Sequence, residues 1–400
     1  MNTPKIFNRA KRILTLTAAT LLLGGVLAPS SALYPISART TTTNTAVQTI
    51  QPAWKKIVAA QNKPQFDTTI TNEGLVIYKA GVYLAAADLK TGKAKWTYKS
   101  TPASTPTYSS NYVYYADTAG RIHKVNGKTG KGVWVKPGVG SKAKEGPYEA
   151  SSVEVYDGMV IVADQHGLAA YDLNSGKLRW NTESQTGYGY KIEYMGGTIV
   201  ASSVSSGAIT TNPIYGISTY TGQVKWALDG DYKQIMSGSN GTVIAVRNNN
   251  GLDQGYALTI DLIEYGTGKK LQTFQYEPVD FVEQQSAYLV DSTLDSIYFV
   301  QANDNGGSTL SRIPFNAPTQ SKAMPVYTSD SRITHLDIKD KLWIGFQDGR
   351  LLAKDATTMM DKFIYKVASG NFIGIEVVDQ QLLIQSGGRI YGATLPTQSK

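Results

Sequence analysis

A nine-residue motif recurs along the chain and constrains its fold more than any other feature. It reads DLKTGKAKW at Asp88–Trp96, NGKTGKGVW at Asn126–Trp134, DLNSGKLRW at Asp172–Trp180 and STYTGQVKW at Ser218–Trp226. In every copy a glycine stands four residues before a tryptophan. A repeat of this kind decides the architecture of the whole chain, because each copy belongs to one structural unit.

Each copy has the composition of a tight hairpin turn followed by a strand. Asp or Asn hydrogen-bonds to the turn amides, and glycine adopts the positive φ that a short loop requires. After the turn, strand alternation places Ala94 and Trp96 on one sheet face and Lys93 and Lys95 on the other. The tryptophan is therefore expected to be a structural contact between neighbouring units, and its burial contributes on the order of a few kcal/mol.

The length of the repeat matches a four-stranded propeller blade. The turn glycines are Gly92, Gly130, Gly176, Gly222 and Gly268. They lie 38 or 46 residues apart, which is the size of a blade. The intervals hold short β-branched and aromatic runs bounded by Gly, Asn and Asp, and no window shows a sustained 3.6-residue apolar period. The sequence therefore predicts an all-β fold.

Counting the units predicts how the ring closes. Seven outer-strand positions can be assigned, at Trp96, Trp134, Trp180, Trp226, Phe274, Tyr327 and Phe363, although the motif decays in the last three. Three more strands follow, FIGIEVV, QLLIQS and RIYGAT, without a fourth, while PAWKKIV near the N-terminus is a strand containing Trp54 without partners. We predict an eight-bladed β-propeller of four-stranded antiparallel blades, in which the N-terminal strand completes the last blade. Seven blades is the alternative.

The stretches AADLKTGKAKW and AAYDLNSGKLRW resemble the PQQ-like repeat. This repeat is found in quinoprotein dehydrogenases and in non-enzymatic relatives such as the outer-membrane assembly lipoprotein propeller. The resemblance covers residues 54–396 and is specific for the fold rather than for the function. The dehydrogenases are considerably longer, and many carry an adjacent cysteine pair, whereas this chain has no cysteine. The resemblance therefore implies the non-enzymatic branch, without PQQ or another cofactor.

Residues 1–32 have the features of a secretory signal peptide. Four basic residues and no acid precede an apolar run over residues 13–27, and small residues follow. Cleavage is expected after Ala32, with Ala38 as the alternative. Because the chain has no cysteine, we expect no disulfide and no lipobox. The predicted product is a secreted or envelope-associated monomer that is not a lipoprotein and has no transmembrane segment.

The rest of the chain divides into three parts. Residues 33–52 are rich in threonine and are expected to form a flexible linker, residues 53–396 the propeller, and residues 397–400 a tail. Four of the 39 basic residues and none of the 31 acidic residues lie in the signal peptide, so the remainder carries a net charge of +4. It shows no stripe of Arg and Lys, and we expect no nucleic-acid partner.

Motifs for catalysis or metal binding are weak. GVGSKA at residues 138–143 matches a dinucleotide fingerprint, but no helix pattern follows it. His123, His166 and His335 fall in three separate blades without the spacing of metal ligands. NDNGG from Asn303 offers oxygen ligands but lacks the bidentate Glu of a calcium loop, so a turn is favoured. We therefore expect no enzymatic activity and no metal.

The expected binding face is the one that carries the long loops. In a four-stranded blade the B–C and D–A connections emerge on one face and the A–B and C–D turns on the other, and the expanded loops of this sequence all belong to the first set. Tyr and Arg are enriched among interface hot spots. The candidate binding residues on this face are Tyr148, Glu149, Tyr188, Tyr190, Arg247 and Asp253.

The sequence thus predicts an exported, non-enzymatic β-propeller that acts as a scaffold for binding proteins or cell-envelope polymers. Two alternatives remain. One is a PQQ-dependent quinoprotein dehydrogenase. The other is a binder of carbohydrate or wall polymer that uses exposed aromatic side chains, for which 25 tyrosines leave room.

Overall fold

The described chain folds into β-strands joined by turns, without an α-helix. The computed structural model describes residues 47–57, 68–71, 73–139, 150–164, 167–183, 190–203, 212–250, 256–276, 288–315, 323–338, 341–366, 372–378, 380–386 and 388–395. They all belong to one unit, residues 44–400. None of them lies in a helix long and apolar enough to cross a membrane.

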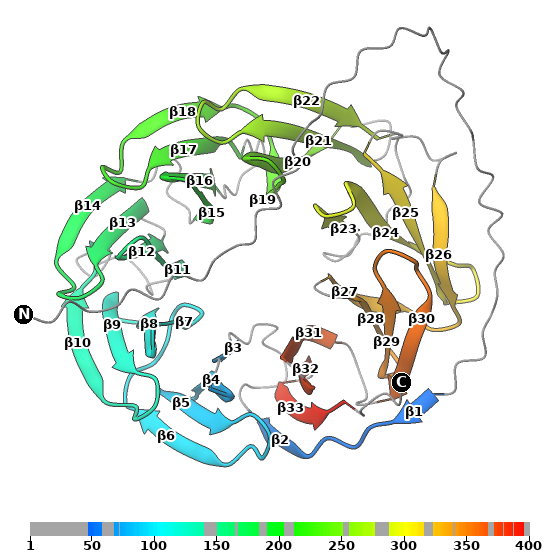
Figure 1. Ribbon diagram of the computed structural model, residues 1–400, viewed down its shortest axis with the longest axis horizontal. Helices are drawn as coiled ribbons and strands as arrows, with labels where there is room; N and C mark the ends of the chain where they lie inside the picture. Colours follow the sequence, from blue (N-terminus) through cyan, green and yellow to red (C-terminus); the bar gives the residue numbers. More distant parts are fainter. Residues whose placement is uncertain are drawn as a thin grey trace, which may run out of the picture. The chain divides into compact units, whose positions relative to one another are not determined.

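The strands form eight sheets arranged as the blades of a ring (Figure 1), each built on four antiparallel strands, which confirms the predicted all-β, eight-bladed propeller. Blades 1 to 4 comprise β3 (Thr68–Ile70), β4 (Leu75–Ala80), β5 (Tyr83–Asp88) and β6 (Ala94–Tyr98); β7 (Thr107–Ser109), β8 (Tyr112–Ala116), β9 (Arg121–Asn126) and β10 (Gly132–Pro137); β11 (Ala150–Tyr156), β12 (Met159–Asp164), β13 (Gly167–Asp172) and β14 (Leu178–Glu183); and β15 (Tyr190–Met195), β16 (Thr198–Ser203), β17 (Ile214–Ser218) and β18 (Val224–Leu228).

Blades 5 to 8 have the same up-and-down order. They comprise β19 (Tyr232–Ser237), β20 (Thr242–Asn250), β21 (Tyr256–Glu264) and β22 (Lys270–Gln275); β23 (Tyr288–Asp291), β24 (Ser296–Ala302), β25 (Ser308–Pro314) and β26 (Met324–Ser329); β27 (Ile333–Ile338), β28 (Lys341–Phe346), β29 (Arg350–Asp355) and β30 (Asp361–Lys366); and β31 (Phe372–Val378), β32 (Gln381–Ser386), β33 (Arg389–Thr394) and β2 (Trp54–Ile57). The first strand of each blade lies toward the centre of the ring and the last at its rim (Figure 1).

The repeated motif forms the C–D turn, as predicted. In blade 1 Asp88 Oδ1 accepts hydrogen bonds from the backbone nitrogen and the hydroxyl of Thr91, at 2.9 and 2.8 Å. Gly92 follows at φ 65°, in the left-handed region that glycine adopts without steric cost. Asp172 and Ser175 repeat both contacts in blade 3. The Asp, the hydroxyl residue and the glycine therefore build the turn together.

The structure adds a second reason for the glycine, which is the tryptophan of the preceding blade. A Cβ on Gly92 would lie 2.6 Å from the ring of Trp54, and one on Gly130 would lie 2.7 Å from the ring of Trp96. Each indole also donates to a carbonyl of the turn that it covers, from Trp54 Nε1 to Leu89 O at 2.8 Å for example. Trp180 and Trp226 repeat this arrangement on the turns of Gly222 and Gly268. The predicted contact between neighbouring units is confirmed.

Two copies of the motif keep the geometry of the turn and its stacking contact although one of the usual features is missing. In blade 7 Met359 replaces the glycine and keeps a positive φ of 58°. In blade 2 the Nε1 atom of Trp134 has no hydrogen-bond partner among the described residues. The carbonyl that it would reach, Leu173 O, instead accepts a 3.0 Å bond from Lys124 Nζ. The stacking contact is thus retained where its hydrogen bond is lost, since Gly176 still packs against the ring of Trp134.

One predicted outer-strand position is shifted. Phe274 lies in β22 and is buried, but the residue eight positions after the start of the turn at Glu264 is Gln272. Gln272 pairs with Leu262 as Trp226 pairs with Gly216, so Gln272 occupies the tryptophan position. Phe274 lies two residues later on the same sheet face and packs against Phe315 of blade 6, with 5.7 Å between ring centroids.

The two ends of the propeller pair as predicted. β2 runs antiparallel to β33, with Trp54 opposite Gly392, and supplies the outer strand of blade 8. The blue β2 beside the red β33 shows this closure in Figure 1. Trp54 then covers the first turn of blade 1, so one residue joins blade 8 to blade 1.

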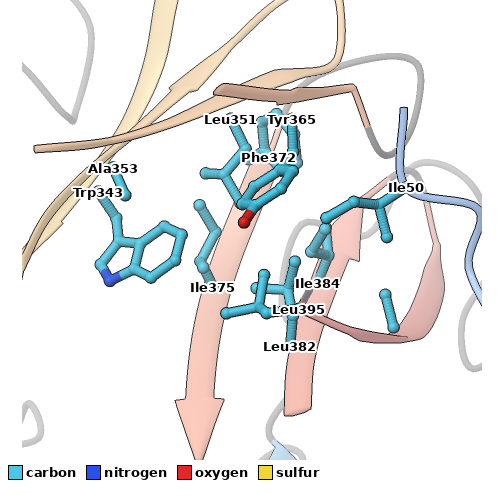
Figure 2. Close-up of a cluster of buried hydrophobic side chains, with 11 residues drawn as sticks. Ile50, Trp343, Leu351, Ala353, Tyr365, Phe372, Ile375, Leu382, Ile384 and Leu395 are labelled. Atoms are coloured by element: carbon cyan, nitrogen blue, oxygen red, sulfur yellow. The ribbon is translucent and has the colours of Figure 1, made fainter. Parts of the chain in front are cut away.

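The predicted linker over residues 33–52 extends too far toward the propeller. Val47–Thr49 form β1, which pairs in parallel with β30 and makes blade 7 five-stranded. Ile50 follows and is buried among side chains of blades 7 and 8, including Tyr365 and Phe372 (Figure 2). The outer edge of β30 offers unpaired backbone groups, and β1 pairs with them. The N-terminal segment therefore pairs with two blades, blade 7 through β1 and blade 8 through β2.

The double role of the turn glycine predicts different costs for the same substitution at two sites. Gly81 has φ 61° and open space around its Cα, whereas Gly130 has φ 70° and faces Trp96. Gly81→Ala should cost about 1–2 kcal/mol from backbone strain alone. Gly130→Ala should cost at least about 2 kcal/mol more, because the indole must move. Chemical denaturation of both variants measures the difference, and equal midpoints would contradict the assigned contact.

Candidate functional site

The predicted binding face can be assessed at only one of its six residues. Tyr148, Glu149, Tyr188 and Asp253 lie outside the described residues, as does the side chain of Tyr190, the first residue of β15. Arg247 lies on β20 with its side chain 24% exposed. Its Nε atom is 2.8 Å from Asp261 Oδ2, and its Nη2 atom is 3.3 Å from Oδ1. The guanidinium is therefore engaged within its own blade.

Asp261 is the centre of a network that ties all four strands of blade 5. Besides Arg247 on β20, Tyr232 on β19 donates to Oδ2 at 3.0 Å, and Thr273 on β22 donates to Oδ1 at 2.7 Å. Lys270 Nζ lies 3.3 Å from Oδ2. Burial acts to raise the pKa of Asp261, but the hydrogen bonds from Thr273 and Arg247 and the nearby positive charges outweigh it, so the pKa is lowered. Arg247 is thus a structural brace.

A second buried network surrounds Asp117 after β8. Its Oδ2 atom lies 2.8 Å from both His123 Nε2 and Arg121 Nε, and Oδ1 accepts the backbone nitrogen of Arg121 at 2.9 Å. Ser100 Oγ lies 3.4 Å from the same His123 Nε2 atom. A Ser–His–Asp relay needs the two ring nitrogens to face opposite partners. Since Nε2 serves both neighbours here, the network stabilises blade 2 and is not arranged for proton transfer.

The other motifs noted in the sequence take ordinary positions where they are described. His335 lies on β27, where burial lowers its pKa, and His166 lies outside the described residues. Asn303 closes the NDNGG segment into a turn with Gly306, whose backbone nitrogen donates to Asn303 O at 3.0 Å. The turn favoured by the sequence is confirmed. Beyond residue 139, the dinucleotide-like GVGSKA segment is outside the described part.

Acidic and hydroxyl side chains lie at equivalent positions on the innermost strands of several blades. Following cross-strand pairs inward from the tryptophan position reaches one described residue in every blade except blade 6; Trp180, for example, leads through Ala170 and Ile161 to Glu154. In blade 6 the row runs from Tyr327 through Leu310 to Val300, and the next position lies outside the described residues. We call the seven described residues the inner layer. In blades 1 to 5, 7 and 8 they are Thr69, Thr107, Glu154, Glu193, Met236, Asp337 and Glu376. These seven residues include four carboxylates and no basic residue, and the acids occupy two pairs of adjacent blades.

The threonines of the inner layer connect neighbouring blades. Thr69 Oγ1 donates to Pro106 O of blade 2, and Thr107 Oγ1 donates to Val153 O of blade 3. An ionised carboxylate has no proton to donate, so Glu154 and Glu193 cannot replace these hydroxyls. In blades 1 and 2 the inner-layer residue therefore makes a hydrogen bond to the next blade. In blades 3 and 4 the same position holds an acidic side chain.

Glu154 and Glu193 lie in an environment that disfavours their charge. Burial raises the pKa of Glu154, and the neighbouring Glu193 raises it further. Burial likewise raises the pKa of Glu193, against the effect of a 3.0 Å hydrogen bond from Ser237 on β19. Tyr194 stacks on Tyr156 with ring centroids 5.1 Å apart. Its hydroxyl oxygen is fully buried and has no hydrogen-bond partner among the described residues.

A cleft of about 450 Å³ opens between the inner strands of blades 8, 1 and 2. The inner-layer residues Thr69, Thr107 and Glu376 line it, together with Tyr108. The Tyr108 hydroxyl donates to the Glu73 carboxylate, and burial together with this bond raises the pKa of Tyr108. The cleft and the acidic pair of blades 3 and 4 thus belong to one ring of inner-strand residues.

Three comparisons place this architecture among known proteins. BamB from Moraxella catarrhalis is similar with a TM-score of 0.55 at 12% identity, covering 86% of this chain and 100% of that chain. The quinohemoprotein alcohol dehydrogenase from Comamonas testosteroni is similar with a TM-score of 0.59 at 12% identity, covering 87% and 78%. Sqt1 from Saccharomyces cerevisiae reaches 0.60 at 12% identity, covering 88% and 100%. Likenesses at this level of identity show the fold alone.

The class of the protein is thus an eight-bladed β-propeller of PQQ-like repeats, as the resemblance implied. A family model described as outer membrane protein assembly factor BamB matches residues 22–228 and 138–271, which together exceed half of the chain. The chain therefore belongs to this family. A search of curated protein sequences found no match.

Proposed function

We propose that this protein is an exported, non-enzymatic propeller that binds other proteins at the cell envelope. The main support is its membership of a family described as an outer membrane protein assembly factor, over more than half of the chain. The predicted signal peptide and the absence of cysteine support an envelope location without a lipid anchor. The constant turns and variable loops of the ring support binding on the loop face.

The dehydrogenase alternative has weaker support. The likeness to quinohemoprotein alcohol dehydrogenases is of the same size as the likeness to BamB, so the fold does not distinguish the two. The described residues contain no group of three His, Cys, Asp or Glu side chains placed to hold a metal ion. In the buried networks around Asp117 and Asp261, the carboxylate oxygens are engaged by side chains and backbone groups of their own blades. These observations favour a scaffold.

Affinity capture tests the proposed function and the choice of face. Tagged residues 33–400 are incubated with isolated envelopes, and captured proteins are quantified. Tyr188→Ala with Tyr190→Ala should weaken capture by roughly 1 kcal/mol or more, because tyrosines on binding loops are frequent hot spots. The matched control, Lys93→Ala with Lys128→Ala, changes exposed side chains at the C–D turns and should leave capture unchanged. Loss of capture in the lysine pair alone would show that the turn face binds the partner.

A further inference from the structure

Blade 7 differs from the other blades because a fifth strand covers its outer edge. β1 (Val47–Thr49) pairs in parallel with residues 364–366 of β30, and the backbone nitrogen of Ile50 continues the ladder with a 3.1 Å hydrogen bond to Lys366 O. The outer strands of the other seven blades carry no fifth strand in the part of the chain that the structure describes. The chain itself therefore shows that an extended segment can bind at the rim of this propeller.

β1 is a small element that the ring does not need for its closure. β2 alone supplies the fourth strand of blade 8. Only three residues of β1 pair, and parallel pairing is slightly less stable per residue than antiparallel pairing. Among the described residues β1 faces only the second half of β30, so the edge at residues 361–363 lies beyond it. A longer segment that pairs along the whole of β30 would therefore compete with β1.

The residue after β1 indicates which side chain such a segment needs. Ile50 is 7% exposed and belongs to the buried apolar cluster between blades 7 and 8 (Figure 2). Tyr365 of β30 and Phe372 of β31 are members of the same cluster. If Ile50 left together with β1, apolar surface of both blades would be exposed to water, which favours its replacement by another aliphatic side chain. The site thus combines a backbone edge with an apolar contact at one end.

We propose that the outer edge of β30 is a binding site for an extended segment of a partner protein, and that β1 occupies this site in the free protein. The inference rests on the proposed scaffold function and gives the chemistry of the partner. The partner offers a strand that pairs in parallel with β30, followed by an isoleucine, valine or leucine in the place of Ile50. Main-chain hydrogen bonds supply the affinity, and the aliphatic side chain supplies the specificity.

A disulfide between β1 and β30 tests whether this edge must open. Thr49 and Lys366 are register partners, and neighbouring strands lie about 4.8 Å apart, a spacing that a disulfide can bridge. Because the chain has no cysteine of its own, Thr49→Cys with Lys366→Cys forms a single bridge. The probe is a fluorescent peptide with the sequence of residues 44–51, NTAVQTIQ, and fluorescence anisotropy is the readout. The reduced protein should bind the peptide, and the oxidised protein should not.

Ile50→Asp tests the same edge from the opposite direction. Burying a carboxylate disfavours the bound state of β1. The variant should bind the peptide at least about tenfold more tightly than wild type, because the apparent affinity follows the fraction of molecules with an open edge. The matched control, Ile57→Asp, changes a side chain that is 77% exposed and should bind as wild type does. A peptide with Asp in the place of Ile50 should bind none of these proteins. Melting temperatures confirm that each variant is folded.

Equal binding by the oxidised and reduced proteins would overturn the site, as would equal binding by wild type and Ile50→Asp. A covalent dimer formed on oxidation would assign the edge to β1 of a second copy and would also overturn the proposal.

Envelope capture with the disulfide variant separates this inference from the proposed function. Oxidation should reduce capture, because it keeps β1 in place. Capture that is unchanged by oxidation would leave the scaffold function standing and would overturn the edge of β30 as the partner's site. If no form of the protein captures a partner, the scaffold function is wrong, and peptide binding alone then decides whether the edge accepts a strand.

Discussion

Deletion of residues 47–57 will open the propeller and lower its melting temperature by a large amount. The deletion removes the outer strand of blade 8, which makes four cross-strand pairs with β33, and also removes β1 from the edge of blade 7. It further removes the Trp54 ring from the Gly92 turn and the 2.8 Å bond to Leu89 O. Blade 8 is then left with an exposed edge strand, and the Gly92 turn of blade 1 loses the ring that covers it.

A point variant isolates the largest part of this effect. Trp54→Ala should cost about 3–5 kcal/mol, as for other large aromatic side chains removed from packed sites. Ile57→Ala in the same strand is the matched control and should cost little, because the Ile57 side chain is 77% exposed. Thermal and denaturant unfolding measure the stability of the deleted protein and of the two point variants. If the deleted protein melts together with residues 33–400, the N-terminal strand does not close the ring.

Asp261→Ala is expected to be the most damaging single change within a blade. Asp261 is fully buried and is bonded to a side chain from each of the other three strands of blade 5. Removing one partner of a buried ion pair leaves the other charge uncompensated and costs about 3–5 kcal/mol. The exposed Asp229→Ala serves as the control and should melt as wild type does.

The pH dependence of the same variant gives an independent check. The pKa of Asp261 is lower in the folded protein than in the unfolded chain, so its ionisation stabilises the fold above the unfolded pKa. This contribution is lost as the pH falls through the folded pKa. The difference in melting temperature between wild type and Asp261→Ala should therefore shrink in acid. A constant difference at every pH would mean that the loss comes from packing alone.

The blades were predictable because their signal is local and repeated. Asp88, Gly92 and Trp96 lie within nine residues, and each residue type has its own physical reason to be in a turn or behind it. Repetition then supplied the number of blades, and the unpaired strands at the two ends supplied the closure. The reason that Gly92 faces Trp54 was not readable, because the contact joins different blades.

The inner layer and the pairing of β1 with blade 7 were not predictable for the same reason. Glu154 and Glu376 share a register only when pairs are followed across three strands, and bulges in these ladders shift the count. β1 has three residues in a threonine-rich segment, and its partner β30 lies more than 300 residues away. The sequence did not show that Arg247 is bound by Asp261. The two residues lie on neighbouring strands of a hairpin, and the register of that hairpin cannot be read from the sequence.

The proposed function requires that this propeller binds partners and does not act as a quinoprotein. The most direct test mixes purified residues 33–400 with PQQ and Ca²⁺, desalts the mixture and records the quinone absorbance together with dye-linked oxidation of alcohols and sugars. We predict no retained quinone and no oxidation above the protein-free control. Retention of one PQQ per chain with substrate-dependent dye reduction would contradict it and assign the protein to the dehydrogenases.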